Sequence, residues 1–409
     1  MSMKLSGLAV AGMSIMAAGV QPALAQDADD ALIRGFKNGK AIVDVNVRYE
    51  QVDDDNSDDK AKGLTVRTRL GYQTASMAGF RLLGEFTDTR PLFGVNDYQP
   101  EQPKDSPYPT IADPSNTEVN RAFVSYSAFD DLLWLAGGRQ RIILDNWRWV
   151  GNVGWRQKEQ TFDAGSIDLN FGSDWALSYD YITQVQTISA TTTDVKDHLV
   201  NLSFAGWDIG QLVAYAYLLN NEDTDNKSDS YGLRFNGSVK PNNLSFLYTA
   251  EYARQSAKNA MSEKFNVNYY TLMLGLGFKP VTLKLGYEVL GSDGGDYGLQ
   301  TDLATKHAFN GWADLFLTTP KNGLRDLYVD LGANWLGIKW GAIYHNFSAD
   351  EGSDRYGSEI DLLAVKKFNK HYTVALKYAN FRVDSDVEDS LEYSLRDVSK
   401  FWVWFNFKY

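Results

Sequence analysis

Cysteine is absent from the 409 residues, and histidine occurs only four times. Without cysteine the chain cannot form a disulfide, a thiolate nucleophile or a cysteine metal site. Long apolar runs are absent as well. After residue 26 there is no stretch of about 18 uninterrupted apolar residues, and the mean hydropathy is −0.35, so a helical membrane protein is excluded. Basic residues number 40 against 52 acidic ones, and the net charge of −12 argues against nucleic acid as a partner.

Apolar and aromatic residues are plentiful. Hydrophobic residues make up 44% of the chain, too many for a disordered protein. The aromatic residues comprise 23 Tyr, 21 Phe and 11 Trp. The length suits two or three soluble domains of about 100–200 residues or one large β-barrel.

The first residues have the features of a signal peptide. Lys4 gives a positive start, residues 5–20 form an apolar stretch, and Ala23-Leu24-Ala25 matches a small-residue cleavage site. We therefore predict a signal peptide over residues 1–25, a short periplasmic segment over 26–39 and a membrane barrel over 40–409. The alternative is a buried N-terminal helix. Export of a cysteine-free chain fits the envelope of a Gram-negative bacterium.

From residue 40 onward, apolar residues recur at every second position, which is the period of a β-strand. Between Leu64 and Tyr72, for example, even positions are mostly apolar and odd positions polar or small. The alternation predicts eighteen strands, at 40–51, 63–74, 79–88, 117–128, 132–144, 158–171, 175–187, 197–206, 210–221, 228–240, 243–256, 264–279, 281–291, 324–335, 338–348, 357–367, 372–383 and 398–409. Residues 292–323 are predicted to be an outer loop, and a sixteen-stranded barrel is the alternative.

The connections between these strands alternate in length. Short turns such as 76–79 and 240–243 alternate with longer acidic loops, which is typical of outer-membrane barrels with short periplasmic turns and longer extracellular loops. Aromatic residues gather toward strand ends, as at a headgroup boundary, whereas a soluble sandwich needs no such belt. We predict an all-β fold, a transmembrane antiparallel barrel integral to the outer membrane and surrounded by lipid and lipopolysaccharide.

The last strand ends on an aromatic residue, Tyr409, with apolar residues at alternate positions before it. Such a strand resembles the signal that the barrel assembly machinery uses, so that machinery is a predicted partner.

If the apolar set faces lipid, the alternate set faces the bore. On the second to fifth predicted strands this set has six arginines and a single acid, Glu85. The arginines are Arg67, Arg69, Arg81, Arg121, Arg139 and Arg141. Arginine suits carboxylates because its planar fork makes two parallel hydrogen bonds. On the opposite side Glu251, Glu288 and Asp330 are expected to point inward. A transverse field would result, although the charges could also simply neutralise one another.

The stretch from Gly138 to Asp163 resembles the hallmark segment of the alginate-export family of outer-membrane barrels. It includes Gly138-Arg139-Gln140-Arg141, Asp145-Asn146-Trp147-Arg148-Trp149 and Trp155-Arg156-Gln157. The resemblance implies an eighteen-stranded barrel whose arginine-lined bore conducts an anionic polysaccharide. From their chemistry, Arg148 and Arg156 with Trp147, Trp149 and Trp155 at the barrel mouth offer guanidinium forks and aromatic platforms for uronic acids. The alternative for this segment is packing alone.

We therefore predict a passive channel for anionic or polar solutes, such as alginate, without catalytic residues, metal or cofactor. Import of small organic acids or other small solutes is one alternative, and a blocked structural barrel is another. A lipid hydrolase is a third, but the four histidines show no convincing Ser-His-acid spacing.

Overall fold

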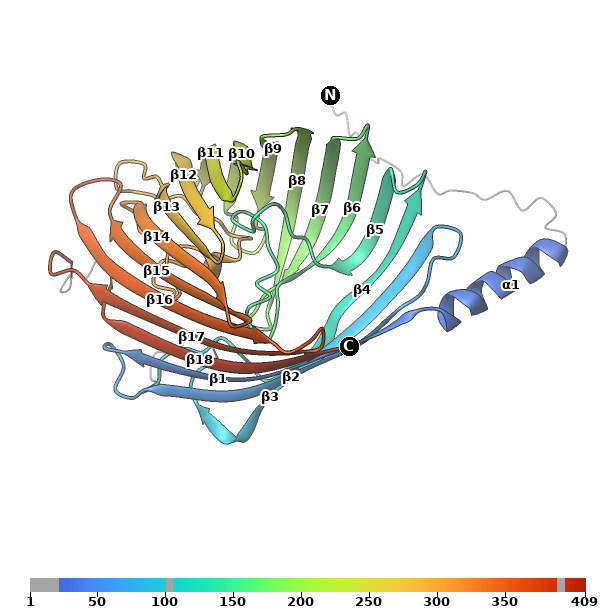
Figure 1. Cartoon of the computed structure of the whole chain (residues 1–409), viewed down its shortest axis with the longest axis horizontal. Helices are drawn as coiled ribbons and strands as arrows, with labels where there is room; N and C mark the ends of the chain where they lie inside the picture. The colour runs from blue at the N-terminus through green and yellow to red at the C-terminus, as the bar shows by residue number, and fades with distance from the viewer. Residues whose placement is uncertain (1–21, 101–105, 388–393) are drawn as a thin grey trace, which may run out of the picture.

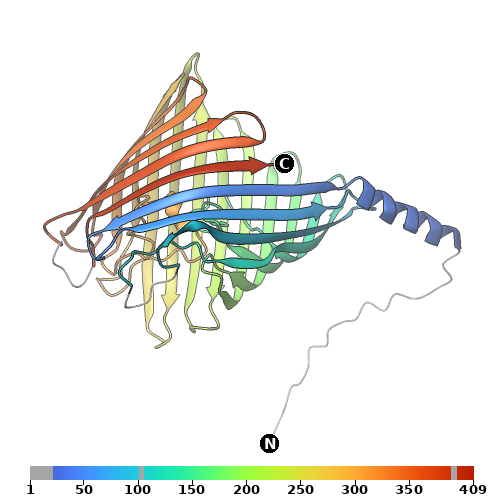
Figure 2. The same ribbon diagram turned by 90° about the horizontal axis from the view of Figure 1, so that it is seen from below.

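The computed structural model describes residues 22–100, 106–387 and 394–409. They form an eighteen-stranded antiparallel sheet that closes on itself, because β1 pairs with both β2 and β18. The strands run obliquely around the barrel (Figures 1 and 2). Their bounds are β1 Lys40–Asp54, β2 Ala61–Gln73, β3 Phe80–Asp97, β4 Asn116–Ala128, β5 Leu133–Gln140, β6 Thr161–Phe171, β7 Trp175–Gln186, β8 Thr192–Trp207, β9 Gly210–Asn220, β10 Lys227–Val239, β11 Leu244–Lys258, β12 Lys264–Phe278, β13 Val281–Leu290, β14 Leu324–Trp335, β15 Ile338–Ser348, β16 Arg355–Lys367, β17 Tyr372–Val383 and β18 Val398–Lys408.

The predicted barrel and its strand count of eighteen are confirmed. Residues 292–323 contain no strand and only one short 3₁₀ helix, Lys306–Ala308. The two strands beside residues 141–160 are shorter than expected. The sixth begins at Thr161 instead of 158, and the larger difference is in the fifth strand. The alternation predicts it over 132–144, but β5 ends at Gln140 because the chain then turns into the bore, with Asp145 at a φ of 51°.

The two sets of alternating side chains lie on opposite faces. On β12, Leu272, Leu274 and Leu276 are exposed on the outside of the barrel, as residues in contact with lipid should be. On β2 the inward Arg67 and Arg69 are only 5% and 4% exposed. Closure of the sheet leaves no strand edge unpaired in hydrocarbon.

The two rims of the barrel differ. At the rim where β1 begins, neighbouring strands are joined by short turns, such as the two-residue turn at 279–280 between β12 and β13. At Gly79, in the turn before β3, φ is +91° and a Cβ would come within 2.6 Å of the Ser127 carbonyl oxygen, so only glycine fits. The longer connections lie at the other rim, which is the extracellular one in barrels of this type.

Two of the long connections fold into the barrel instead of projecting from it. They are residues 141–160, the first inserted loop, and residues 291–323, the second inserted loop. In Figure 1 the teal trace of the first inserted loop runs inside the ring of strands. The loops join along a short parallel bridge between Val150 and Leu303, where the Gly151 amide donates to the Leu303 carbonyl at 2.9 Å.

A helix, α1 (Pro22–Lys37), precedes β1 and lies outside the barrel (Figures 1 and 2). It is anchored at the rim by its last turns, where the Ala75 amide donates to the Gly35 carbonyl at 2.9 Å and the Tyr72 hydroxyl donates to the Phe36 carbonyl. The helix covers most of the predicted periplasmic segment 26–39 and the predicted cleavage site. The rest of the predicted signal peptide lies outside the described residues.

None of the helices in the described part of the chain has the length and apolar character needed to cross a membrane.

Candidate functional site in the bore

The predicted basic residues do gather on one side of the bore, but most of them have carboxylate partners. Arg67 Nη2 lies 2.6 Å from Asp44 Oδ1. Arg121 makes a two-pronged contact with Glu85 at 2.9 and 2.7 Å, and Arg139 makes the same contact with Asp163 at 2.7 and 2.8 Å. Arg81 differs, since its Nη1 lies 3.5 Å from the Ser127 hydroxyl. The positive charge of these strands is therefore largely balanced, by Glu85 on the same strands and by Asp44 and Asp163 on the strands next to them.

Arg141 is predicted to lie on the fifth strand, but it begins the first inserted loop instead. Its Nε donates to both oxygens of Glu159 at 2.7 and 2.8 Å. Arg69 Nη1 also lies 3.5 Å from Glu159, and the side-chain amide of Asn120 donates to Glu159 at 2.6 Å. Burial opposes ionisation of Glu159, but the two arginines outweigh it and lower its pKa to about 2. Glu159 thus remains a carboxylate that holds the end of the loop against β2.

The first inserted loop is fixed to the barrel by two buried arginines. Arg148 Nε lies 2.9 Å from Glu288 on β13, and its guanidinium lies over the ring of Phe309, 4.8 Å from the centroid. Arg156 Nη1 donates to both oxygens of Glu50 on β1, at 3.1 and 2.9 Å. From their chemistry both arginines are predicted to contact the solute, with packing alone as the alternative, and in the structure both make buried contacts within the protein.

The predicted mouth aromatics lie at different depths. Trp147 is 46% exposed, but its carbonyl accepts from the Thr305 amide of the second inserted loop at 3.1 Å, inside the bore. Trp149 is only 8% exposed and packs against Tyr215 and Tyr269, with its indole donating to Glu251 at 2.8 Å. Trp155 is half-buried in the bore. Two of the three rings are therefore deeper than the mouth, because the loop that bears them folds inward.

Trp155 is part of a cluster that joins the two inserted loops. Its ring stacks on His307 of the second inserted loop, with centroids 4.2 Å apart. His307 Nδ1 lies 2.6 Å from Asp314, and Nε2 lies 2.7 Å from Lys377 Nζ on β17. Since an ammonium can only donate, Nε2 accepts and Nδ1 holds the proton. Burial, the largest cause, lowers the pKa of His307 to about 3, so the imidazole is neutral.

The predicted acidic side also lies inside the bore and is similarly engaged. Glu251 accepts hydrogen bonds from Trp149 and Tyr215, at 2.8 and 2.7 Å. Glu288 accepts from the Tyr269 hydroxyl at 2.7 Å and forms an ion pair with Arg148. Asp330 pairs with Lys284 at 2.8 Å. The inward direction of these three acids follows the alternation pattern, whereas their hydrogen-bond and ion-pair partners come from loops and neighbouring strands.

Beneath the inserted loops, toward the periplasmic rim, lies a cavity of about 420 Å³ that we call the basic pocket. Its lining includes six cationic side chains and a single carboxylate, that of Asp44. The cations are Arg48, Arg67, Arg69, Lys367, Lys370 and Lys408. The arginines have acidic partners, but Lys367 and Lys370 form no ion pair among the described residues. These two lysines and Arg48, whose partner is Asp113 of the β3–β4 connection, were not singled out from the sequence.

Neither a metal centre nor a catalytic triad is present in the described part of the chain. No three His, Cys, Asp or Glu side chains there are grouped to hold a metal ion. None of the four histidines hydrogen-bonds a serine in the described ranges. His345, for example, pairs with Asp326 at 2.9 Å, and His198 with the Tyr179 hydroxyl at 2.9 Å.

A closed barrel of eighteen antiparallel strands, with an apolar outer face and a charged bore, defines an outer-membrane channel of the porin type. The model of the alginate export family matches residues 43–295, and the chain belongs to this family. It is an integral outer-membrane protein of a channel family, not an enzyme.

Solved structures show the same fold at low sequence identity. Pseudomonas aeruginosa OpdK, crystallised with vanillate, matches with a TM-score of 0.69 and 13% identity, over 91% of this chain and 99% of OpdK. Acinetobacter baumannii OccAB4 matches with a TM-score of 0.69 and 12% identity, over 91% and 98% of the two chains. Pseudomonas aeruginosa OccK5 (OpdH) matches with a TM-score of 0.64 and 12% identity, over 91% of this chain and 99% of OccK5. No curated protein matches the chain.

Proposed function

We propose that this protein is a passive diffusion channel for small anionic solutes, carboxylates above all. The observation that supports this most directly is the basic pocket, in which six cationic side chains face one carboxylate. Rings of like charge select ions of the opposite sign in pores. Lys367 and Lys370 supply the unpaired part of this charge at the periplasmic end of the bore.

The inserted loops favour small solutes over a polymer. They cross the bore above the basic pocket and are held by buried contacts, Arg156 to Glu50 and Arg148 to Glu288. Trp155, from the first inserted loop, lines the basic pocket itself. A chain of uronic acid rings would have to displace these contacts, whereas a small carboxylate needs only the space beside them.

The likeness to OpdK agrees with this choice, since that structure contains vanillate, an aromatic carboxylate. Membership in the alginate export family supports the second candidate, passage of an anionic polysaccharide such as alginate. In that case the inserted loops would move aside while the polymer passes.

Reversal potentials in planar bilayers under a KCl gradient test the proposal. The native channel should prefer chloride, and the double variant Lys367→Gln/Lys370→Gln should lose most of this preference. Lys240→Gln is the matched control, because Lys240 is an exposed lysine in the periplasmic turn between β10 and β11. Cation preference in the native channel, unchanged in the double variant, would rule out the basic pocket as the selective element.

Solute size is tested by swelling of proteoliposomes. We expect faster entry of benzoate than of the neutral benzamide and no entry of a uronate decamer. Entry of the decamer at the rate of benzoate would favour the polysaccharide candidate.

A further inference from the structure

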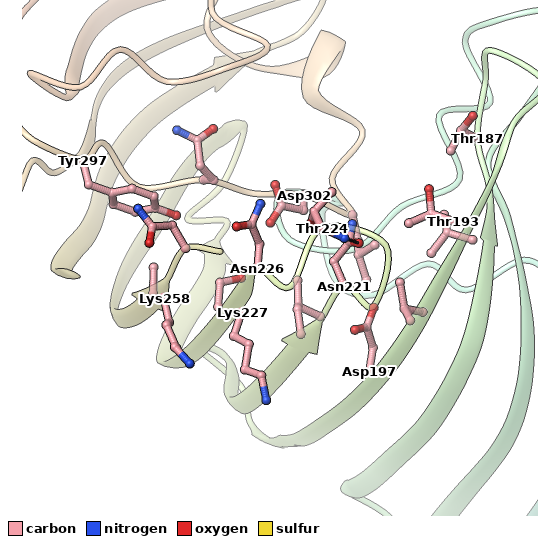
Figure 3. Close-up of a pocket in the computed structure, with 18 of the residues that line it drawn as sticks. Thr187, Thr193, Asp197, Asn221, Thr224, Asn226, Lys227, Lys258, Tyr297 and Asp302 are labelled. Atoms are coloured by element: carbon pink, nitrogen blue, oxygen red, sulfur yellow. Dashed lines mark hydrogen bonds between the residues drawn. The ribbon is translucent and has the colours of Figure 1, made fainter. Parts of the chain in front are cut away.

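A second cavity lies on the other side of the inserted loops, facing the extracellular rim (Figure 3). It has a volume of about 360 Å³, within the range of small-molecule sites. Its sides are inward-facing residues of β7 to β11 and the connections above them. Gln160 and Leu303 form its floor where the two inserted loops meet, and the Gln160 side-chain amide donates to the Leu303 carbonyl at 3.1 Å. We call it the outer pocket.

The charge of the outer pocket is opposite to that of the basic pocket. Asp197 on β8 lines the pocket and is 1% exposed, and its Oδ1 accepts the Asn220 backbone amide at 2.8 Å. Asp302 of the second inserted loop contributes a second carboxylate, which makes no hydrogen bond or ion pair within the described ranges. Asp302 is exposed, whereas Asp197 is a buried carboxylate with no cationic partner among the described residues. Such a group is costly, so the site is incomplete as it stands.

The two lysines at the edge of the outer pocket do not neutralise these carboxylates. Lys227 and Lys258 occupy outward positions, because the adjacent Ser228 and Ala257 face inward and are buried. Figure 3 shows both lysine side chains extending away from Asp302. A further cation, Lys306, interacts with Asp302 through space but does not line the pocket.

The rest of the lining is a mixture of apolar surface and unused hydrogen-bonding groups. Val195, Leu219 and Leu303 supply apolar side chains, and Tyr297 adds an aromatic ring. The hydroxyl of Ser228 is buried and has no hydrogen-bond partner. A ligand that places an ammonium near the carboxylates and an apolar body against these side chains would use both parts of the lining.

We propose that the outer pocket binds small organic cations, namely protonated primary amines with an apolar or aromatic body. A divalent metal ion fits the pocket less well. It needs six or more oxygen ligands, and it gains nothing from apolar walls. No cluster of three acidic or histidine side chains is available for a metal in the described residues. This proposal does not depend on the basic pocket, which lies beyond the inserted loops.

Block of the channel current by benzylamine, added from the extracellular side at neutral pH, tests the proposal. We expect concentration-dependent block by benzylamine and at least about tenfold weaker block by benzyl alcohol, its uncharged analogue. Asp302→Asn should weaken benzylamine block severalfold, and Asp197→Asn/Asp302→Asn should weaken it about tenfold or more. Asn in place of Asp197 keeps an acceptor for the Asn220 backbone amide, and Asp302 has no hydrogen bond or ion pair to lose among the described residues, so both variants should fold.

Asp58→Asn is the matched control, since Asp58 is an exposed carboxylate of the same rim outside the outer pocket. Its block by benzylamine should stay within about twofold of native. Equal block by benzylamine and benzyl alcohol, equal block by Mg²⁺ at the same concentration, or unchanged block in the double variant would each overturn the proposal. The change in chloride preference between the native channel and Lys367→Gln/Lys370→Gln, neither of which alters the outer pocket, tests the basic pocket separately, so failure of one site is distinguishable from failure of the other.

Discussion

Arg156 and Glu50, 106 residues apart in sequence, form a buried ion pair inside the barrel, with Arg156 Nη1 2.9 Å from Glu50 Oε2. The pair fixes the first inserted loop to β1. Glu50 is 0% exposed and Arg156 6%, so water cannot take the place of either partner, and Arg48 lies farther from Glu50, at 3.5 Å. The width of the bore at this level therefore depends on a contact between a loop and a strand.

Removal of this contact should open the bore. Breaking a buried ion pair by removing one partner costs about 3–5 kcal/mol, because the other charge is left unpaired. We expect Arg156→Ala to raise the single-channel conductance and to expose the first inserted loop to trypsin. Arg355→Ala is the control, since Arg355 pairs with Asp386 at the exposed rim. Unchanged conductance and proteolysis in Arg156→Ala would show that other contacts hold the loop.

Acid should weaken the attachment of the inserted loops, and His307 sets the highest pH at which this weakening begins. The pKa of His307 is lowered from 6.5 to about 3 in the folded protein. Between these values the released loop binds a proton that the folded loop does not, so the free energy holding the loop falls as the pH drops, by about 1.4 kcal/mol per unit at most. Glu159, with its pKa lowered from 4.5 to about 2, adds the same trend below about 4.5.

Conductance and trypsin sensitivity should accordingly be constant above about pH 6.5 and rise below it. His307→Gln cannot titrate, so in this variant the rise should begin only near pH 4.5, where Glu159 starts to contribute. Identical pH profiles for the native channel and His307→Gln would contradict the role given to the imidazole.

The paired arginines should still affect selectivity. Substitution of Arg139 by Ala leaves Asp163 without its partner. Substitution of Arg141 by Ala leaves Glu159 with Arg69 as its remaining cationic partner, 3.5 Å away. Each substitution makes the bore more negative by one charge. We expect anion preference to weaken in Arg139→Ala/Arg141→Ala. Arg90→Ala is the control, because Arg90 is an exposed arginine on the outer face of β3. Reversal potentials measure the change, and values equal to native would leave selectivity to the lysines of the basic pocket.

The strands were predictable because their signal is local. A side chain alternates between lipid and bore at every second residue, so β14, β15 and β17 have the predicted bounds. The inward direction of Arg67, Glu251 and Asp330 follows from the same alternation. Nothing in this local pattern, however, states which opposite charge an inward residue meets.

The inserted loops were not predictable for the same reason. Their position depends on contacts between residues far apart in sequence, such as Arg148 with Asn310, 162 residues later, at 3.1 Å. The motif around Trp147 and Trp149 marked the first inserted loop as distinctive. Its inward path shortens the predicted fifth strand and takes Trp149 away from the mouth, and both effects need the whole barrel to be present.

The N-terminal processing stays a prediction. If residues 1–25 are a signal peptide, the exported protein begins at Gln26, and α1 loses its first turn while the contacts of Gly35 and Phe36 remain. Intact-mass measurement of protein from the outer-membrane fraction should give the mass of residues 26–409. Recovery of the full-length chain from that fraction would contradict the assignment.

Recognition by the barrel assembly machinery is tested at Tyr409. The backbone of this residue closes the barrel, with its amide donating to the Val43 carbonyl at 2.8 Å, while its side chain is 73% exposed. Tyr409→Ala keeps the backbone contact, so folding into detergent micelles in vitro should match native. The amount assembled in cells should fall, because the terminal aromatic side chain is missing when the machinery binds the last strand. Phe368→Ala removes an aromatic side chain of similar exposure from a periplasmic turn and should assemble normally. An equal loss for Phe368→Ala, or a loss for Tyr409→Ala in vitro as well, would mean that the side chain serves stability instead of recognition.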